Sequence, residues 1–137
     1  MINRLKLPAI KKRTKGDANM SIKIIGVNNE KRLSSVKLGS EYQVGWKNEY
    51  GTSDLIPSTG NSWKDYWKAY TGGYWPKKCS VFCCDEEAEV GAHVINPAVS
   101  RRDFIVPMCR GCNAKYDEYD PESMILEDGT ILVDANL

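Results

Sequence analysis

Two cysteine pairs decide how this chain folds: Cys79-Ser-Val-Phe-Cys83-Cys84 and Cys109-Arg-Gly-Cys112. All five cysteines and the single histidine, His93, lie between residues 79 and 112. The second pair has the spacing Cys-x2-Cys, and the first is Cys-x3-Cys or Cys-x4-Cys, depending on which of its last two cysteines is used. Two such knuckles separated by a loop are what a tetrahedral zinc ion requires. The sequence therefore predicts one structural zinc ion.

Ordinary buried or disulfide-bonded cysteines are the alternative interpretation. Five is an odd number and would leave one cysteine unpaired, and the absence of a recognisable signal peptide favours reduced thiols and a cytoplasmic location. The x4 spacing favours Cys84 over Cys83, which would then occupy the usual glycine position of a knuckle; both choices stay open. His93 is a further candidate ligand. The expected ligands are Cys79, Cys84, Cys109 and Cys112.

The features around the cysteines follow a recognisable order. A knuckle precedes a short strand ending in His93, then a loop, a second strand and Cys-x-x-Cys-Asn at the start of a helix, over about residues 79–118. This order is similar to that of the zinc-containing branch of the HNH family, the ββα-metal nucleases. The resemblance implies an α+β fold, a small zinc-stapled ββα (HNH- or treble-clef-like) unit. It also implies that His93 is the general base and that Asn113 helps to hold a catalytic Mg²⁺ or Mn²⁺ ion.

The catalytic set of that family is incomplete in this chain. Ala92 stands where the family has an aspartate ligand, and the loop before the second strand offers Asp103 in place of the family's asparagine. A hard divalent ion usually requires at least one carboxylate ligand. We therefore expect a zinc-binding HNH-like domain that binds nucleic acid without complete catalytic machinery. A divalent-metal-dependent HNH endonuclease and a zinc-stabilised protein-interaction module are the alternatives.

Charge is distributed unevenly along the 137 residues, although the net charge is only +1. Residues 1–19 carry six Lys or Arg and one Asp, whereas residues 116–137 carry seven Asp or Glu and no Lys or Arg. We expect a flexible basic arm over residues 1–19 and a single zinc-binding domain over residues 20–137. No apolar run approaches the length of a membrane span, so we expect a soluble protein without a membrane partner.

Basic residues also lie beside the knuckles, in the intervening loop and on the expected helix. They are the candidates for nucleic-acid contact, and the alternative is solubilising charge scattered over the surface. The six residues are Lys77, Lys78, Arg101, Arg102, Arg110 and Lys115.

The remaining patterns predict short elements around the zinc unit. Trp63, Tyr66, Trp67 and Tyr70 share one helical face, after Ser62 as cap and before Gly72-Gly73. We expect this stripe to pack in the core; a stacking platform for unpaired bases is the alternative. Asp128-Gly129 between two apolar runs predicts a hairpin. The expected strands are 21–27, 32–38, 41–46, 89–94, 104–108, 124–126 and 130–133, with a loop at 47–61 and helices from Ser62 and over 110–118.

Overall fold

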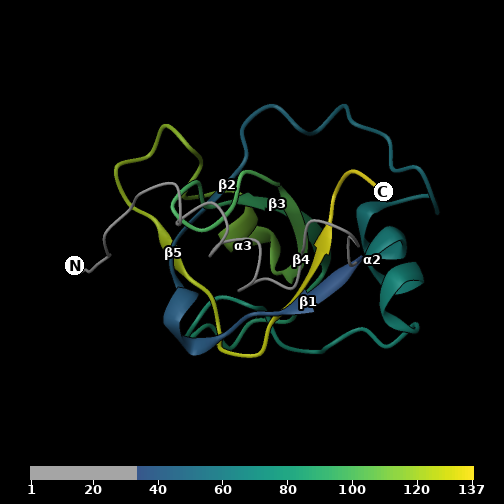
Figure 1. Cartoon of the computed structure of the whole chain (residues 1–137), viewed down its shortest axis with the longest axis horizontal. Coiled ribbons are helices and arrows are strands. Elements are labelled where there is room, and N and C mark those ends of the chain that lie inside the picture. The colour runs from purple at the N-terminus through teal and green to yellow at the C-terminus, as the bar shows by residue number, and fades with distance from the viewer. Residues whose placement is uncertain (1–33) are drawn as a thin grey trace.

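A computed structural model describes residues 34–137, which form a six-stranded antiparallel sheet with little helix (Figure 1). The strand order is β1-β6-β4-β3-β2-β5. The strands are β1 (Ser35–Lys37), β2 (Val44–Asn48), β3 (Val90–Ile95), β4 (Phe104–Met108), β5 (Met124–Ile125) and β6 (Ile131–Asp134). The helices are the 3₁₀ turn η1 (Ser40–Tyr42), α2 (Trp63–Thr71) and the single turn α3 (Arg110–Asn113).

The predicted α+β class, built on a ββα unit, is wrong. β3 and β4 do pair as an antiparallel hairpin, but they form the centre of the larger sheet, and the helix that follows them ends at Asn113. Asn48 explains this early end, because its side chain donates to the carbonyls of Cys112 and Lys115 and its backbone N–H donates to that of Tyr116. Long-range hydrogen bonds thus take the carbonyls that a longer helix would use, and the described part of the chain is mostly β.

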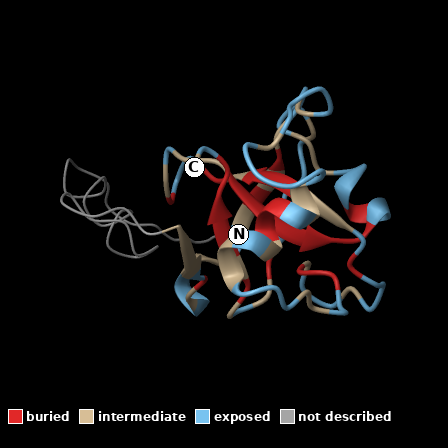
Figure 2. Cartoon of the chain, turned by 90° about the vertical axis from the view of Figure 1, so that its right-hand side faces the viewer, coloured by how far each residue is buried: buried red, intermediate tan, exposed pale blue. Residues whose placement is uncertain are grey.

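One face of the sheet surrounds the main hydrophobic core. Because all six strands or their adjoining residues contribute to this one cluster, the sheet is curled around it, and Figure 2 shows the buried strands at the centre of the molecule. Three cysteines, Cys79, Cys109 and Cys112, belong to the same cluster. The largest apolar members are Leu38, Trp46, Val94, Phe104, Met108, Met124, Leu126 and Leu132.

Helix α2 covers the opposite face of the sheet, and its aromatic stripe faces the strands. Ser62 caps it by accepting a 3.1 Å hydrogen bond from the Asp65 N–H, and Gly72 ends it in the left-handed conformation. Tyr66 and Trp67 are buried in a second cluster with residues of β4 and β6. The core interpretation of the stripe is therefore confirmed, and these two rings are not available to stack on bases.

The predicted hairpin around Asp128-Gly129 is wrong in its pairing. The turn itself exists, with Gly129 at φ +85° and a 3.2 Å bond from the Thr130 N–H to the Glu127 carbonyl. However, β5 pairs with β2, and β6 lies between β1 and β4. The two strands separate after the turn because each finds a different apolar partner across the sheet.

The N-terminal predictions are only partly covered by the structure. The basic arm over residues 1–19 and the expected strand 21–27 lie outside the described residues. The expected strand 32–38 appears as β1, whereas the expected strand 41–46 begins with η1 and becomes β2 only at Val44. Within residues 34–137 the longest helix has nine residues, and none is long and apolar enough to cross a membrane.

Candidate metal centre

Four cysteine sulfurs converge at one end of the main core. The ligand atoms of Cys79, Cys84, Cys109 and Cys112 all lie within 4.8 Å of one another. The Cys84 Sγ is 3.9 Å from the Cys109 Sγ and 3.8 Å from the Cys112 Sγ. A tetrahedral site with Zn–S bonds of about 2.3 Å has S–S edges of about 3.8 Å. The cluster therefore has the dimensions needed to hold a metal ion such as zinc.

The first knuckle is a small loop closed by backbone hydrogen bonds. The Cys79 N–H donates to the Glu86 carbonyl at 3.0 Å, and the Ala88 N–H donates to the Lys77 carbonyl at 2.8 Å. Within the loop Cys83 adopts φ +63° and is exposed, while Cys84 turns inward to the cluster. Of the two adjacent cysteines, Cys84 is the one that the structure brings to the other three sulfurs, and Cys83 occupies the position suited to glycine.

The second knuckle follows directly from strand β4. Cys109 caps the single turn of α3, and its Sγ accepts a 3.3 Å hydrogen bond from the Cys112 N–H. A hydrogen bond of this kind stabilises a thiolate. Cys79, Cys109 and Cys112 are buried, and Cys84 is half-buried, so solvent reaches the cluster only at its edge.

Two of the buried thiols, those of Cys79 and Cys112, resist ionisation when no cation is present. Burial raises the pKa of Cys79 and of Cys112, and neighbouring thiols raise the pKa of Cys112 further. For Cys109, burial also acts to raise the pKa, but hydrogen bonds from the Cys112 N–H and from nearby thiols lower it overall. A soft divalent cation would offset the charge of several thiolates at once, which is why sites of four sulfurs select zinc or iron.

His93 and Asn113 belong to different elements, strand β3 and the short helix α3. His93 is buried on β3, with its ring packed edge-on against Trp63 of α2 at a centroid distance of 4.3 Å. Its neighbours Ala92 and Val94 point the other way, into the cluster that holds the cysteines. Asn113 is exposed at the end of α3. Among the described residues, His93 has a ring contact with Trp63, and no hydrogen bond joins it to Asn113.

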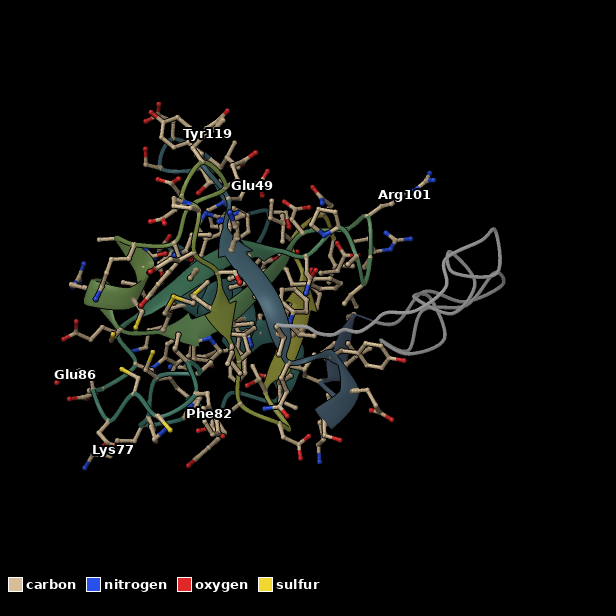
Figure 3. All side chains as sticks on the ribbon, turned by 90° about the vertical axis from the view of Figure 1, so that its left-hand side faces the viewer. Glu49, Lys77, Phe82, Glu86, Arg101 and Tyr119 are labelled. Atoms are coloured by element: carbon tan, nitrogen blue, oxygen red, sulfur yellow. The ribbon has the colours of Figure 1, made fainter. Side chains whose placement is uncertain are left out.

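The six basic candidates do not form one continuous surface. Three of them are in ion pairs within residues 34–137, and Lys115 lies over the Tyr116 ring at 5.8 Å. Lys77 and Arg101 lie at opposite ends of the molecule (Figure 3). The paired residues are Lys78 with Glu127, Arg102 with Asp134, and Arg110 with Glu89.

Glu49 is a further candidate functional residue. It lies in the predicted loop over residues 47–61, and no sequence pattern marks it as functional. Burial, a hydrogen bond with Asp103 and the charges of Asp103 and Glu118 raise the pKa of Glu49 to about 7. Burial lowers the pKa of His93, against the opposing effect of the Asp103 charge. No local pattern could reveal this group, because its members meet only through the pairing of β2 with β3 and of β3 with β4.

The fold and the cluster define a class of protein: a curled antiparallel sheet with a four-cysteine centre that could hold a metal ion. No protein-family model matches the chain, and neither does any curated protein or solved structure. The likeness to HNH nucleases accordingly rests on the residues of this chain alone.

Proposed function

We propose that this protein is a zinc-dependent binding domain in which one zinc ion has a structural role. The convergence of four cysteine sulfurs beside the main core carries the proposal. Four protein thiolates fill a tetrahedral zinc site and leave no position for water or substrate, as in structural rather than catalytic zinc centres. The ion would join the first knuckle to the end of β4 and so contribute folding free energy.

Metal analysis of the purified chain tests this role. We expect about one zinc per chain, and we expect a chelator to lower the melting temperature in proportion to the zinc removed. Protein that contains disulfides in place of zinc, or that keeps its melting temperature after complete zinc removal, would contradict the proposal.

The same proposal excludes hydrolysis by the HNH mechanism. Ala92 provides no carboxylate, and His93 packs against Trp63 of α2, on the side of the sheet opposite the cysteine cluster. We expect no nicking of plasmid DNA in Mg²⁺ or Mn²⁺ above the level of a His93→Gln variant. Divalent-dependent nicking that is lost in this variant while its fold is retained would instead establish the nuclease.

Nucleic acid is the partner class that we propose, on the resemblance to the HNH family and on the basic residues. Lys77, Arg101 and Lys115 make no ion pair within the described residues, whereas the other three candidates are neutralised internally. We therefore expect weak binding with a shallow salt dependence, because few phosphates would be neutralised. Mobility-shift titrations at two salt concentrations measure the affinity and its salt dependence. They are repeated with the double variant that combines Lys77→Gln and Arg101→Gln.

One observation favours a protein partner as the second candidate. Val44 and Ile125 pair directly across β2 and β5, and both are exposed, as is Phe82, whose N–H donates to the Ile125 carbonyl at 2.7 Å. The register shift between Val44 and Trp46 turns Val44 outward. Contiguous exposed apolar side chains often mark an interaction surface. The absence of any shift with DNA or RNA would favour this second candidate.

A further inference from the structure

We propose a second metal site, on the sheet face opposite the cysteines, for a divalent cation with carboxylate and imidazole ligands. Its ligands are Glu49, His93 and Asp103. The site is independent of the four-cysteine centre and of the binding role proposed above, since none of its residues belongs to either.

Strand pairing places the three side chains on one face. Glu49 lies directly opposite His93, because its N–H donates to the His93 carbonyl at 3.0 Å and continues the register that pairs Asn48 with Val94. Asp103 lies two positions before Ile105, the residue that pairs with His93 on β4. Since alternate residues of a strand share a face, and opposed residues bring their Cβ atoms within about 5.5 Å, the three groups lie together.

Two buried polar atoms in this group lack hydrogen-bond partners. His93 is only 5% exposed, and its Nε2 has no partner. The Glu49 Oε1 is also buried and without a partner. Trp63 packs against the imidazole from α2 and supplies no polar group to it. Buried polar atoms normally have hydrogen-bond partners, so the unpartnered His93 Nε2 and Glu49 Oε1, on residues that lie opposite each other across the strands, indicate a missing ligand.

Among residues 34–137, the charge around the group is negative and no ion pair offsets it. Glu118, whose Oε1 accepts a 3.0 Å bond from the Tyr50 N–H, adds its charge to those of Glu49 and Asp103. None of the ion pairs within residues 34–137 involves these three acids, because the nearby Arg102 is paired with Asp134. The Asn136 side chain donates to Asp103 Oδ1 at 2.7 Å and orients that carboxylate. A divalent cation would compensate the charge that no basic side chain of the described residues pairs with.

The donor set defines the class of ion. One imidazole nitrogen and two carboxylates suit a first-row divalent ion such as Mn²⁺ or Zn²⁺. Among the described residues only the four sulfurs already converge as a group of metal ligands, so binding would require the three side chains of the second site to move closer together. Glu49 lies near Tyr119 and away from Lys77 and Glu86, whose loop carries the first knuckle (Figure 3). The two sites are thus well separated.

Mn²⁺ is the probe of choice, because it binds thiolate sites poorly and would leave zinc at the cysteines. Full-length zinc-loaded protein is titrated with Mn²⁺ while free Mn²⁺ is measured by electron paramagnetic resonance. We expect one bound Mn²⁺ per chain and a loss of affinity of about tenfold or more when Glu49→Gln and Asp103→Asn are combined. The matched control combines Glu41→Gln and Glu86→Gln, which remove the same charge from two exposed acids, and should bind as the parent does.

A second measurement needs no variant. His93 is the only histidine of the chain, so its imidazole C–H signals are identified in a proton NMR spectrum without assignment. Sub-stoichiometric Mn²⁺ should broaden them selectively, because the ion would lie one bond from the ring. Absence of Mn²⁺ binding, binding that leaves the His93 signals sharp, or equal affinity in the folded Glu49→Gln, Asp103→Asn variant would each overturn the proposal.

Discussion

Adjacent cysteines have different roles in the first knuckle. Cys84 lies in the four-sulfur cluster, whereas Cys83 is exposed at φ +63°. We expect Cys84→Ser to reduce the zinc content well below one per chain, because a hydroxyl is a poor zinc ligand. Cys83→Ser is the matched control and should keep its zinc, with a stability change within about 0.5 kcal/mol, as for other exposed residues. A colorimetric assay measures the zinc content of both variants. Zinc loss in Cys83→Ser would contradict the assignment of Cys84, rather than Cys83, to the metal site.

Glu49 gives a prediction with a definite pH dependence. Its pKa is raised from 4.5 to about 7 in the folded protein, so the stabilisation from its bound proton is complete below pH 4.5 and is lost as the pH rises through 7. Gln cannot ionise. The experiment uses buffer free of divalent cations other than the bound zinc. The stability of Glu49→Gln, measured relative to the parent, should therefore be greater at about pH 8 than at about pH 6.

Urea midpoints at these two pH values measure the gain. Asp103, Glu118 and His93 face Glu49 in both proteins, so the difference between the two proteins reports mainly on Glu49. Glu41→Gln, which removes one carboxylate from the exposed surface, is the matched control for the loss of a charge. An advantage that is the same at both pH values would mean that Glu49 ionises normally in the folded protein.

The contact between α2 and β3 depends on one glycine. A Cβ at Gly91 would lie 2.6 Å from the backbone carbonyl of Trp63, and backbone atoms cannot rotate away as side-chain ends can. We expect Gly91→Ala to destabilise the fold by about 1–3 kcal/mol, the usual cost of overpacking. In Gly111→Ala the added methyl group would meet nothing nearer than the Cys109 Sγ at 4.0 Å. Thermal denaturation measures the melting temperatures of Gly91→Ala and Gly111→Ala. Equal values would show that α2 packs against β3 less closely than the structure indicates.

The elements that could be predicted from the sequence have local signals. Ser62 and Gly72 bound α2, and cysteine spacing identifies the two knuckles and the ligand set that the structure brings together. The wrong predictions concern elements whose ends or pairing partners are determined by residues distant in the sequence. Asn48 ends α3 through hydrogen bonds to Cys112 and Lys115, and pairing with β2 rather than β6 determines the place of β5. The Glu49 group could not be predicted for the same reason, since it exists only once three strands are side by side.

At the scale of the whole molecule, the cysteine centre connects parts of the fold that are distant in sequence. Three of the four clustered cysteines belong to the main core, and the first knuckle is hydrogen-bonded to the segment around β5 through Phe82 with Ile125 and Glu127 with Ser80. Zinc removal should therefore release the edge of the sheet together with the core, and α2 should follow because it packs on the reverse of the same strands. Metal loss should produce a single cooperative transition rather than local unfolding.

The four tryptophans report on this transition from different places. Each indole N–H donates to a backbone carbonyl: Trp46 to Tyr42, Trp63 to Leu55, Trp67 to Ile131 and Trp75 to Ala88. In ¹⁵N-labelled protein we expect all four dispersed indole signals to collapse together on chelation and to return with Zn²⁺ but not with Mg²⁺, since thiolates bind Mg²⁺ poorly. If the Trp63 and Trp67 signals stayed dispersed while that of Trp46 collapsed, α2 and its face of the sheet would fold independently of the metal.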